Sequence, residues 1–349
     1  MIADLFADED TVEVAAGLAV MDGGLRCGLS RRTLIGAVRD LIEAAPDKPV
    51  GLVAGSGFED RPQLLEALAA LIPILGNGTK VVSAVKDPAG LAARCRDLGI
   101  PHPETRTEPA LSGEWLLKRK GGSGGSHIRA YSLGESVPAG HVLAQTLPGT
   151  PMSVTAIGNG RDAALVGFCR QFADPVEGQP FRFGGLCGPV DLPQAIAVGV
   201  GKATKGLAAA FGLKGFFSMD FLLEGESWWC LEVNPRPGAS LDVLDQASSP
   251  LFAAHVDACV NGRLPDERRV APAAIRYSRI VYADKEIAGI PALEWPEWVS
   301  DRPSAGSRIP AGAPLATVLA EGKELDDAAA LAMARAQELL KIIGEVEQC

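Results

Sequence analysis

The sequence has no long apolar run and no basic leader, and both absences bear on where the protein works. No uninterrupted apolar segment approaches the roughly 18 residues that a membrane-spanning helix needs. The N-terminal stretch MIADLFADEDTVEV is acidic and lacks the basic-then-apolar order of a secretory signal. We therefore expect a cytoplasmic protein with no membrane partner.

Cysteine pairs, clustered histidines and excess positive charge are also missing. The seven cysteines are scattered without a C-x-x-C pair, and the four histidines are equally dispersed. This pattern indicates reduced thiols rather than disulfides or a zinc site. The formal net charge of −10 argues against a duplex nucleic-acid partner, which needs a basic surface. No Ser-His-Asp or Cys-His constellation for covalent catalysis is visible.

The chain does have length and apolar content. Its 349 residues, 47% of them hydrophobic, suffice for two or three packed units with a large buried core. Composition and periodicity divide it into a small α/β unit over residues 1–85, a central unit over 86–262 and a smaller unit over 263–349. We expect a mixed α/β (α+β) fold.

Apolar spacing predicts the individual elements. Helical spacing is found at residues 32–45, 63–75, 88–98, 192–211, 253–260 and 327–343. Strand-like runs are found at residues 49–55, 80–84, 114–119, 162–170, 275–282 and 314–319, with two more between 142 and 157. Residues 180–193 are rich in Gly and Pro, which favours a loop.

Residues 216–238, FFSMDFLLEGESWWCLEVNPRPG, are the most informative segment. Two apolar-alternating runs flank the short turn Glu224–Ser227, which predicts a β-hairpin. If the loop is centred on Glu226, Asp220 and Glu232 lie directly opposite each other across the ladder.

Further polar groups gather at the same strand end. Asn234 shares the face of Glu232 because side chains alternate at period two, and Arg236 follows one step later. Magnesium is usually held by one or two carboxylates plus substrate phosphates, and arginine offers a planar fork for a carboxylate or phosphoryl oxygen. The alternative is a merely solvated face, but like charges directly opposite call for a compensating cation. The pattern therefore predicts a magnesium site beside phosphate.

Lys118 precedes a run that predicts an anion-binding loop. Residues 121–126 read GGSGGS; glycine lets backbone N–H groups approach an anion closely, and serine adds donors. Such a loop is mobile, which suits a flap over phosphates. It is not a Walker A sequence, because the lysine comes before the glycines. The alternative is a flexible surface linker.

Two weaker signals precede this loop, and one further pair follows it. Lys86, between an apolar run and a helix, is a second candidate phosphate lysine, with an ordinary surface lysine as the alternative. Residues 55–57, Gly-Ser-Gly, could cradle phosphate, but an incomplete fingerprint favours a tight strand-to-helix turn. Arg170 and Arg182 are candidates to border an acceptor pocket.

Taken in order, these motifs resemble those of an ATP-grasp enzyme. They are Lys86, the glycine run after Lys118, and the hairpin pattern Asp220…Glu232-x-Asn234-x-Arg236. Residues 55–62 and 76–78 also resemble predicted ATP-dependent carboligases related to biotin carboxylase. The resemblance implies an ATP-grasp fold with an N-terminal pre-ATP-grasp, Rossmann-like domain, a lid over about 107–145 and a small C-terminal domain.

The resemblance also implies a role for each matching residue. Lys86 and Lys118 would contact ATP phosphates, and Arg236 would steady the acceptor carboxylate and the developing phosphoryl charge. Lys118 and Arg236 are thus the implied catalytic residues. The implied closing loop consists of Gly121, Gly122, Ser123, Gly124, Gly125 and Ser126. One or two Mg²⁺ ions, which Mn²⁺ could replace, would be held by Asp220, Glu232 and Asn234.

The adenine hinge departs from the family's pattern. Gln145, Thr146 and Leu147 lie where the family's hinge strand receives adenine, through a side-chain acceptor and backbone groups. The family usually has glutamate followed by an aromatic or branched residue there. Thr150 and Pro151 also stand where many relatives have an acidic residue for ribose.

The implied activity is an ATP- and Mg-dependent ligase that joins a small-molecule carboxylate to an amine through an acylphosphate. The chain faintly resembles tyramine–glutamate ligase-like members, which build coenzymes. A non-catalytic ATP-binding scaffold or regulatory subunit stays open, as does a Rossmann oxidoreductase suggested only by the N-terminal unit. The C-terminal unit leaves a homodimer open.

Overall fold

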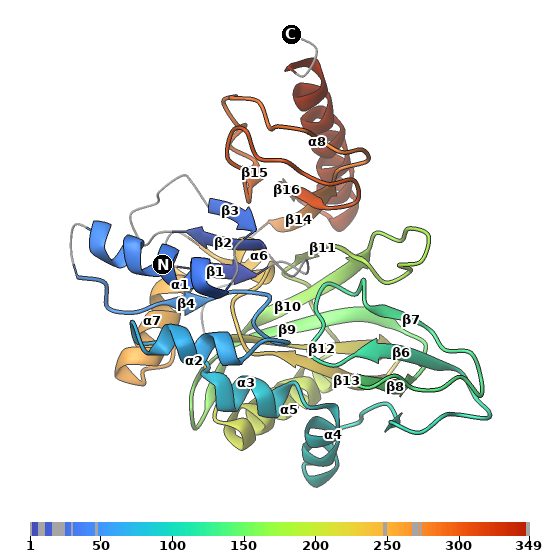
Figure 1. The fold of residues 1–349 in the computed structure, drawn as a ribbon. Coiled ribbons are helices and arrows are strands. Elements are labelled where there is room, and N and C mark those ends of the chain that lie inside the picture. Colours follow the sequence, from blue (N-terminus) through green and yellow to red (C-terminus); the bar gives the residue numbers. More distant parts are fainter. Residues whose placement is uncertain are drawn as a thin grey trace.

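The computed structural model describes residues 2–5, 11–15, 25–28, 31–45, 48–246, 250–266, 272 and 274–346. These residues form an eight-stranded sheet and two four-stranded sheets, with helices packed around them (Figure 1). A mixed helix-and-sheet fold was expected and is confirmed. Within these ranges every helix is too short or too polar to cross a lipid bilayer.

The eight-stranded sheet carries the predicted site. Its neighbouring strands are antiparallel and follow the order β13-β12-β9-β10-β11-β14-β16-β15. Their bounds are β9 (Thr150–Asn159), β10 (Ala163–Ala173), β11 (Phe183–Gly188), β12 (Lys214–Glu224), β13 (Ser227–Asn234), β14 (Ile275–Tyr282), β15 (Val299–Ser300) and β16 (Pro314–Gly322). Three strands from beyond residue 262 thus extend the central sheet.

Helices cover the two faces of this sheet unequally. Helix α5 (Gln194–Phe211), which ends at the left-handed Gly212, packs on β9, β12 and β13 through a core that includes Val200 and Leu207. Helices α6 (Ser240–Leu244) and α7 (Leu251–Asn261) pack on part of the opposite face, against Phe216 among others. Helix α8 (Leu325–Val346) covers β14 and β16 (Figure 1).

The second sheet lies beside the hairpin end of the central sheet (Figure 1). It has the order β5-β8-β6-β7, with bounds β5 (Thr105–Arg106), β6 (Trp115–Arg119), β7 (Ile128–Ala130) and β8 (His141–Gln145). Its small core contains Trp115, Leu117, Tyr131 and Leu143. We call this sheet and its loops the lid.

The N-terminal sheet has the order β3-β2-β1-β4, and only the β1–β4 pair is parallel. The elements of this region are β1 (Ile2–Leu5), β2 (Thr11–Ala15), β3 (Leu25–Gly28), β4 (Val53–Ala54), α1 (Arg31–Ala44), α2 (Gln63–Ala69), α3 (Thr79–Val85) and α4 (Pro88–Asp97). Asp87 caps the N-terminus of helix α4, where its side chain accepts a hydrogen bond from the Gly90 N–H at 3.0 Å.

Two predicted elements are wrong. Residues 80–84 were expected to form a strand but belong to helix α3, where Val82 and Val85 bury one face at helical spacing. Residues 180–193 were expected to be a loop but contain β11. Its glycines permit close strand packing, because a Cβ on Gly185 would collide with the carbonyl oxygen of Ser278 on β14.

Three other expectations hold only in part. Strand 49–55 shortens to β4, with one further bridge between Leu52 and Ile74. Helix 63–75 ends at Ala69, as α2. The two strands between 142 and 157 exist as β8 and β9, but they belong to different sheets.

Candidate active site

The β12–β13 hairpin places Asp220 directly opposite Glu232, as predicted. The route to this register differs from the prediction. Glu224 pairs with Ser227, so the tip is a two-residue turn rather than a loop centred on Glu226. A one-residue shift leaves Leu231 as a bulge in β13 and restores the predicted pair. Both carboxylates therefore lie on one face of the sheet.

Asn234 connects the two carboxylates. Its Nδ2 donates to Asp220 Oδ2 at 2.9 Å and, more weakly, to Glu232 Oε1 at 3.4 Å. Its Oδ1 accepts from Lys86 Nζ at 2.7 Å, and the same ammonium lies 3.3 Å from Glu232 Oε2. Lys86, at the end of α3, thus lies at the acidic hairpin, where its ammonium partly neutralises the charge of the carboxylates.

Asp220 retains an oxygen that nothing in the protein satisfies. Its Oδ1 is buried and has no hydrogen-bond partner. Burial, together with the neighbouring Glu232 charge, raises the pKa of Asp220 to about 7, although Ser153, Gln171 and Lys86 act in the opposite direction. A buried carboxylate oxygen that lacks a hydrogen-bond partner, on a group with a raised pKa, is a suitable ligand for a cation.

Glu232 has the opposite tendency. Burial alone would raise its pKa, but Lys86, Lys118 and His127 outweigh burial and hold the pKa of Glu232 below its usual range. Its side chain is 42% exposed, so water screens part of this attraction. The pair therefore contains one firmly ionised carboxylate and one that gives up its charge readily.

These donors suit a hard cation that also binds phosphate. In the described part of the chain, no three His, Cys, Asp or Glu side chains gather around one point. The oxygens available are those of Asp220, Glu232 and Asn234. A magnesium ion held by so few protein oxygens takes its remaining ligands from phosphates and water.

Lys118 and His127 face this cluster from the lid. Burial lowers the pKa of Lys118, and the Glu232 carboxylate opposes that shift. Burial also lowers the pKa of His127, an effect that Glu232 and the Ser123 backbone oppose and that Arg119 and Lys118 reinforce. Sequence reasoning found Lys118 but missed His127; the available signal was a titratable side chain directly after the glycine run.

The predicted flap is clamped between two other segments. A Cβ on Gly121 would lie 2.8 Å from the carbonyl oxygen of Glu59, and Arg119 pairs with Asp60 at 3.0 Å. On the other side, the Phe183 N–H donates to the carbonyl oxygen of Gly124 at 2.8 Å. The loop thus lies in a closed position, with glycine where the backbones meet.

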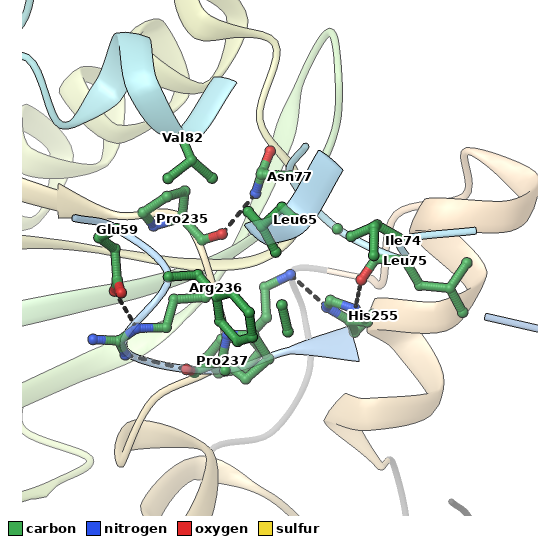
Figure 2. A pocket seen from close by; sticks show the side chains of 15 residues that line it. Glu59, Leu65, Ile74, Leu75, Asn77, Val82, Pro235, Arg236, Pro237 and His255 are labelled. Carbon is green, nitrogen blue, oxygen red and sulfur yellow. Dashed lines mark hydrogen bonds and ion pairs between the residues drawn. The ribbon is translucent and has the colours of Figure 1, made fainter. Parts of the chain in front are cut away.

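Arg236 is oriented by a residue that sequence reasoning missed. Its Nε donates to Glu59 Oε1 at 2.6 Å, and its Nη1 donates to the Pro237 carbonyl at 3.1 Å (Figure 2). Glu59 is 3% exposed; burial alone would raise its pKa, but Arg236 and Lys86 outweigh burial and lower it. The Gly57 N–H donates to Glu59 Oε2 at 2.7 Å, which favours the tight-turn interpretation of residues 55–57.

Next to Arg236, the N-terminal unit joins the central sheet (Figure 2). Asn77 Nδ2 donates to the carbonyls of Lys214 and Pro235, each at 2.9 Å, and its Oδ1 accepts from the Lys214 N–H at 2.9 Å. His255 contacts the Leu75 carbonyl at 3.0 Å. The cavity here holds about 20 Å³, room for roughly one water molecule, so it is a packing defect rather than a substrate pocket.

The remaining candidates are the hinge residues and two arginines. The backbone N–H groups of Gln145 and Thr146 donate to the carbonyls of Glu104 and Glu114, both at 2.9 Å, and Leu147 follows in the connection to β9. A nucleobase at this hinge would therefore use side-chain or carbonyl groups.

The two arginines proposed for an acceptor pocket differ in their surroundings. Arg170 pairs with Met152, which pairs with Phe221, so it lies on the sheet face opposite Asp220 and does not border the hairpin site. Arg182 is bonded to Asp174 and lies over the Tyr282 ring.

Known proteins resemble this chain in sequence and in fold. Residues 86–240 match the family model of the ATP-grasp domain. The carbamoyl phosphate synthase large chain of Thermus thermophilus is 27% identical over 230 residues, which are 58% of this chain and 22% of that relative. The chain thus spans about a fifth of the length of this relative.

Solved structures share the fold at low identity. The biotin carboxylase domain of the Hydrogenobacter thermophilus 2-oxoglutarate carboxylase, determined with MgADP, ADP and bicarbonate, has a TM-score of 0.69 and 14% identity, covering 87% of this chain and 77% of that one. The L-amino acid ligase of Bacillus licheniformis has a TM-score of 0.64 and 14% identity, covering 88% and 84%. Residues 86–240 thus match the ATP-grasp domain, and the chain shares the fold of these solved structures.

Proposed function

We propose that the chain is an ATP- and Mg-dependent ligase that joins a small carboxylate to an amine. The observation that carries this proposal is the buried Asp220 Oδ1 without a partner, opposite Glu232 and beside Asn234. The named activity of the L-amino acid ligase and the MgADP in the carboxylase structure support it by analogy.

The proposed reaction needs positioning and charge neutralisation rather than a protein nucleophile. An oxygen of the carboxylate attacks the terminal phosphorus, the bond to the bridging oxygen of ADP breaks, and an acylphosphate forms. The amine nitrogen then attacks the acyl carbon, phosphate leaves, and the amine proton is released. Inorganic phosphate is thus a product, and the free amine a substrate, of the proposed reaction.

Each residue of the site has a task in this scheme. Asp220, Glu232 and Asn234 would hold the magnesium ion, which when bound neutralises phosphate charge. Lys118 would bind phosphate from the lid. Arg236, oriented by Glu59, would hold the acceptor carboxylate.

Lys86 has a second position to occupy. It donates to Asn234 and Glu232, and it would exchange these oxygens for phosphate when the metal–nucleotide complex enters.

The branch related to biotin carboxylase and a role in coenzyme assembly are part of this proposal. Mn²⁺ would support the reaction in place of Mg²⁺.

A thermal-shift series tests the nucleotide class. MgATP and MgADP should raise the melting temperature of the chain, because a ligand that binds only the folded state stabilises it. NADH should not, and a shift with NADH alone would favour an oxidoreductase. Asp220→Ala should remove the magnesium dependence of the shift, and Glu224→Ala, an exposed carboxylate at the hairpin tip, is the control.

Coupled ADP release tests catalysis. A survey of small carboxylic acids and amines should identify a pair that accelerates ADP formation, and Asp220→Ala should abolish it. Nucleotide binding without ADP release for any pair would indicate the scaffold alternative instead.

A further inference from the structure

His127 ends the glycine-rich loop, and its ring is packed into a fixed position. A Cβ on Gly122 would lie 2.5 Å from Cγ and Cδ2 of the imidazole. The ring therefore occupies the space that any other residue at position 122 would fill. This packing holds the imidazole against the loop backbone, so its orientation follows that of the lid.

One nitrogen of this ring has no partner in the protein. Nδ1 is buried and makes no hydrogen bond. A buried polar atom without a partner costs free energy, so native structures keep such atoms mainly where they do something. The loop around it otherwise offers glycine and serine, so His127 is its one ionisable side chain between residues 121 and 127.

The charged groups around the ring identify what it could bind. Glu232 acts on it from the hairpin, and Arg119 and Lys118 act on it from β6. Under the proposed function, Lys118 would bind phosphate and Glu232 would help to hold the metal. The charges of Glu232 and Lys118 both act on the His127 ring, so a phosphoryl group bound between them would lie near this ring, where Nδ1 is available.

We infer that His127 is a substrate-binding residue of the lid, which donates a hydrogen bond from Nδ1 to the terminal phosphoryl group of a bound nucleoside triphosphate. This inference rests on the proposed function. It gives the lid a contact that depends on the third phosphate, beyond the general attraction that lysine and backbone N–H groups exert on any anion. A triphosphate would then be distinguished from a diphosphate by the closed lid.

Calorimetric titration with MgADP and with the magnesium complex of a non-hydrolysable β,γ-imido ATP analogue tests this contact. His127→Ala should weaken binding of the triphosphate analogue about tenfold or more, as expected for a lost hydrogen bond to a charged group, and leave MgADP within about twofold. His127→Asn should recover part of the loss, because its amide N–H lies near the position of Nδ1. His141→Ala removes another lid histidine, whose Nδ1 faces the Ala139 carbonyl at 3.2 Å, and serves as the control.

Each outcome decides the matter. Equal weakening of both nucleotides by His127→Ala would assign the ring a structural role in the loop and overturn the inference. Unchanged binding of both would overturn it as well. If the wild-type chain bound neither nucleotide, the proposed function itself would fail, and this result differs from either of the other two.

Discussion

Asp220 and Glu232 bring two carboxylates together on adjacent strands, and the protein supplies only part of the compensation they need. Lys86 lies against Glu232 and Asn234, whereas Asp220 keeps a buried oxygen without a partner. Like charges in a half-buried site make the second ionisation costly. The chain without metal therefore stores an electrostatic penalty at its most polar point.

This penalty predicts a pH dependence of stability. The pKa of Asp220 is about 7 in the folded chain and 3.8 as the ordinary value. Between these values the folded state keeps a proton that the unfolded state has lost, so the free energy of unfolding falls as pH rises from about 4 to 7. Urea unfolding in a chelating buffer should show this decline.

Asp220→Asn provides the comparison, because other groups also titrate in this range. The variant should lose the decline and be more stable than the wild type near pH 7.5, while no longer gaining stability from MgADP. Parallel pH profiles of the two proteins would contradict the assignment of the raised pKa to Asp220.

The Glu59–Arg236 pair gives a second prediction at this scale. Removing one partner of a buried ion pair leaves the other uncompensated, so Glu59→Ala should lower the free energy of unfolding by roughly 3 kcal/mol. Denaturant unfolding measures this loss. Glu66→Ala, on the exposed side of α2, should change stability little; similar losses in both variants would count against a special role for Glu59.

The sequence alone predicted the polar residues of the hairpin, but it did not predict the roles of Glu59 and His127. Asp220, Glu232 and Asn234 follow from alternation within one short segment, which is a local rule. Glu59 is 177 positions from Arg236, and no local rule connects them. His127 becomes informative only in the folded chain, where its Nδ1 is buried and the Glu232 charge acts on its ring.

At the scale of elements, two causes explain the wrong predictions: close backbone packing in β11 and ambiguous periodicity in α3. Strand β11 looked like a loop because it is glycine-rich, yet these glycines let it pair between β10 and β14. Helix α3 looked like a strand because a short apolar run fits either period. Longer elements such as α5 and α8 were predicted well, since their periodicity extends over several turns.

Two neighbouring glycines of the lid allow a matched experiment. Gly124 and Gly125 have similar positive φ values, 71° and 74°, so alanine carries a similar backbone cost of roughly 1–2 kcal/mol at either position. A Cβ on Gly125 would collide with the Phe181 carbonyl oxygen, whereas a Cβ on Gly124 has nothing within 4 Å. Only Gly125→Ala should displace the loop from β11.

Amide hydrogen exchange over residues 180–186 measures this displacement. The Phe183 N–H donates to the Gly124 carbonyl oxygen in the closed lid, and Gly125→Ala should expose it. This amide should therefore exchange faster in Gly125→Ala than in Gly124→Ala. MgADP affinity should fall in the same order. Equal exchange in both variants would mean that the contact with Phe181 does not hold the lid.

At the scale of the whole molecule, a few side chains tie the N-terminal unit to the central sheet. Asn77 makes three hydrogen bonds to backbone atoms of Lys214 and Pro235, and His255 joins Leu75 to Phe216. Composition divided the chain into units, but it gave no sign of these bonds. It also could not show that strands from beyond residue 262 complete the eight-stranded sheet, because that pairing is long-range.

Asn77→Ala tests the strength of this junction. The substitution leaves one buried N–H and two carbonyl groups without their partner, so the free energy of unfolding should fall by roughly 2–3 kcal/mol. Asn261→Ala, which removes an exposed bond to Asp257, should have a much smaller effect. Denaturant unfolding of both variants compares them; equal small losses would mean that the junction relies on apolar packing alone.

The bulge at Leu231 has a practical consequence for work on this chain. Because the extra residue lies between the tip and the carboxylate pair, the length of the turn does not by itself decide which side chains meet at the end that carries Asp220 and Glu232. Glu226 is exposed and separated from Asp220 by several paired residues. A fluorescent label or short tag attached there would report on the hairpin while leaving its functional end undisturbed.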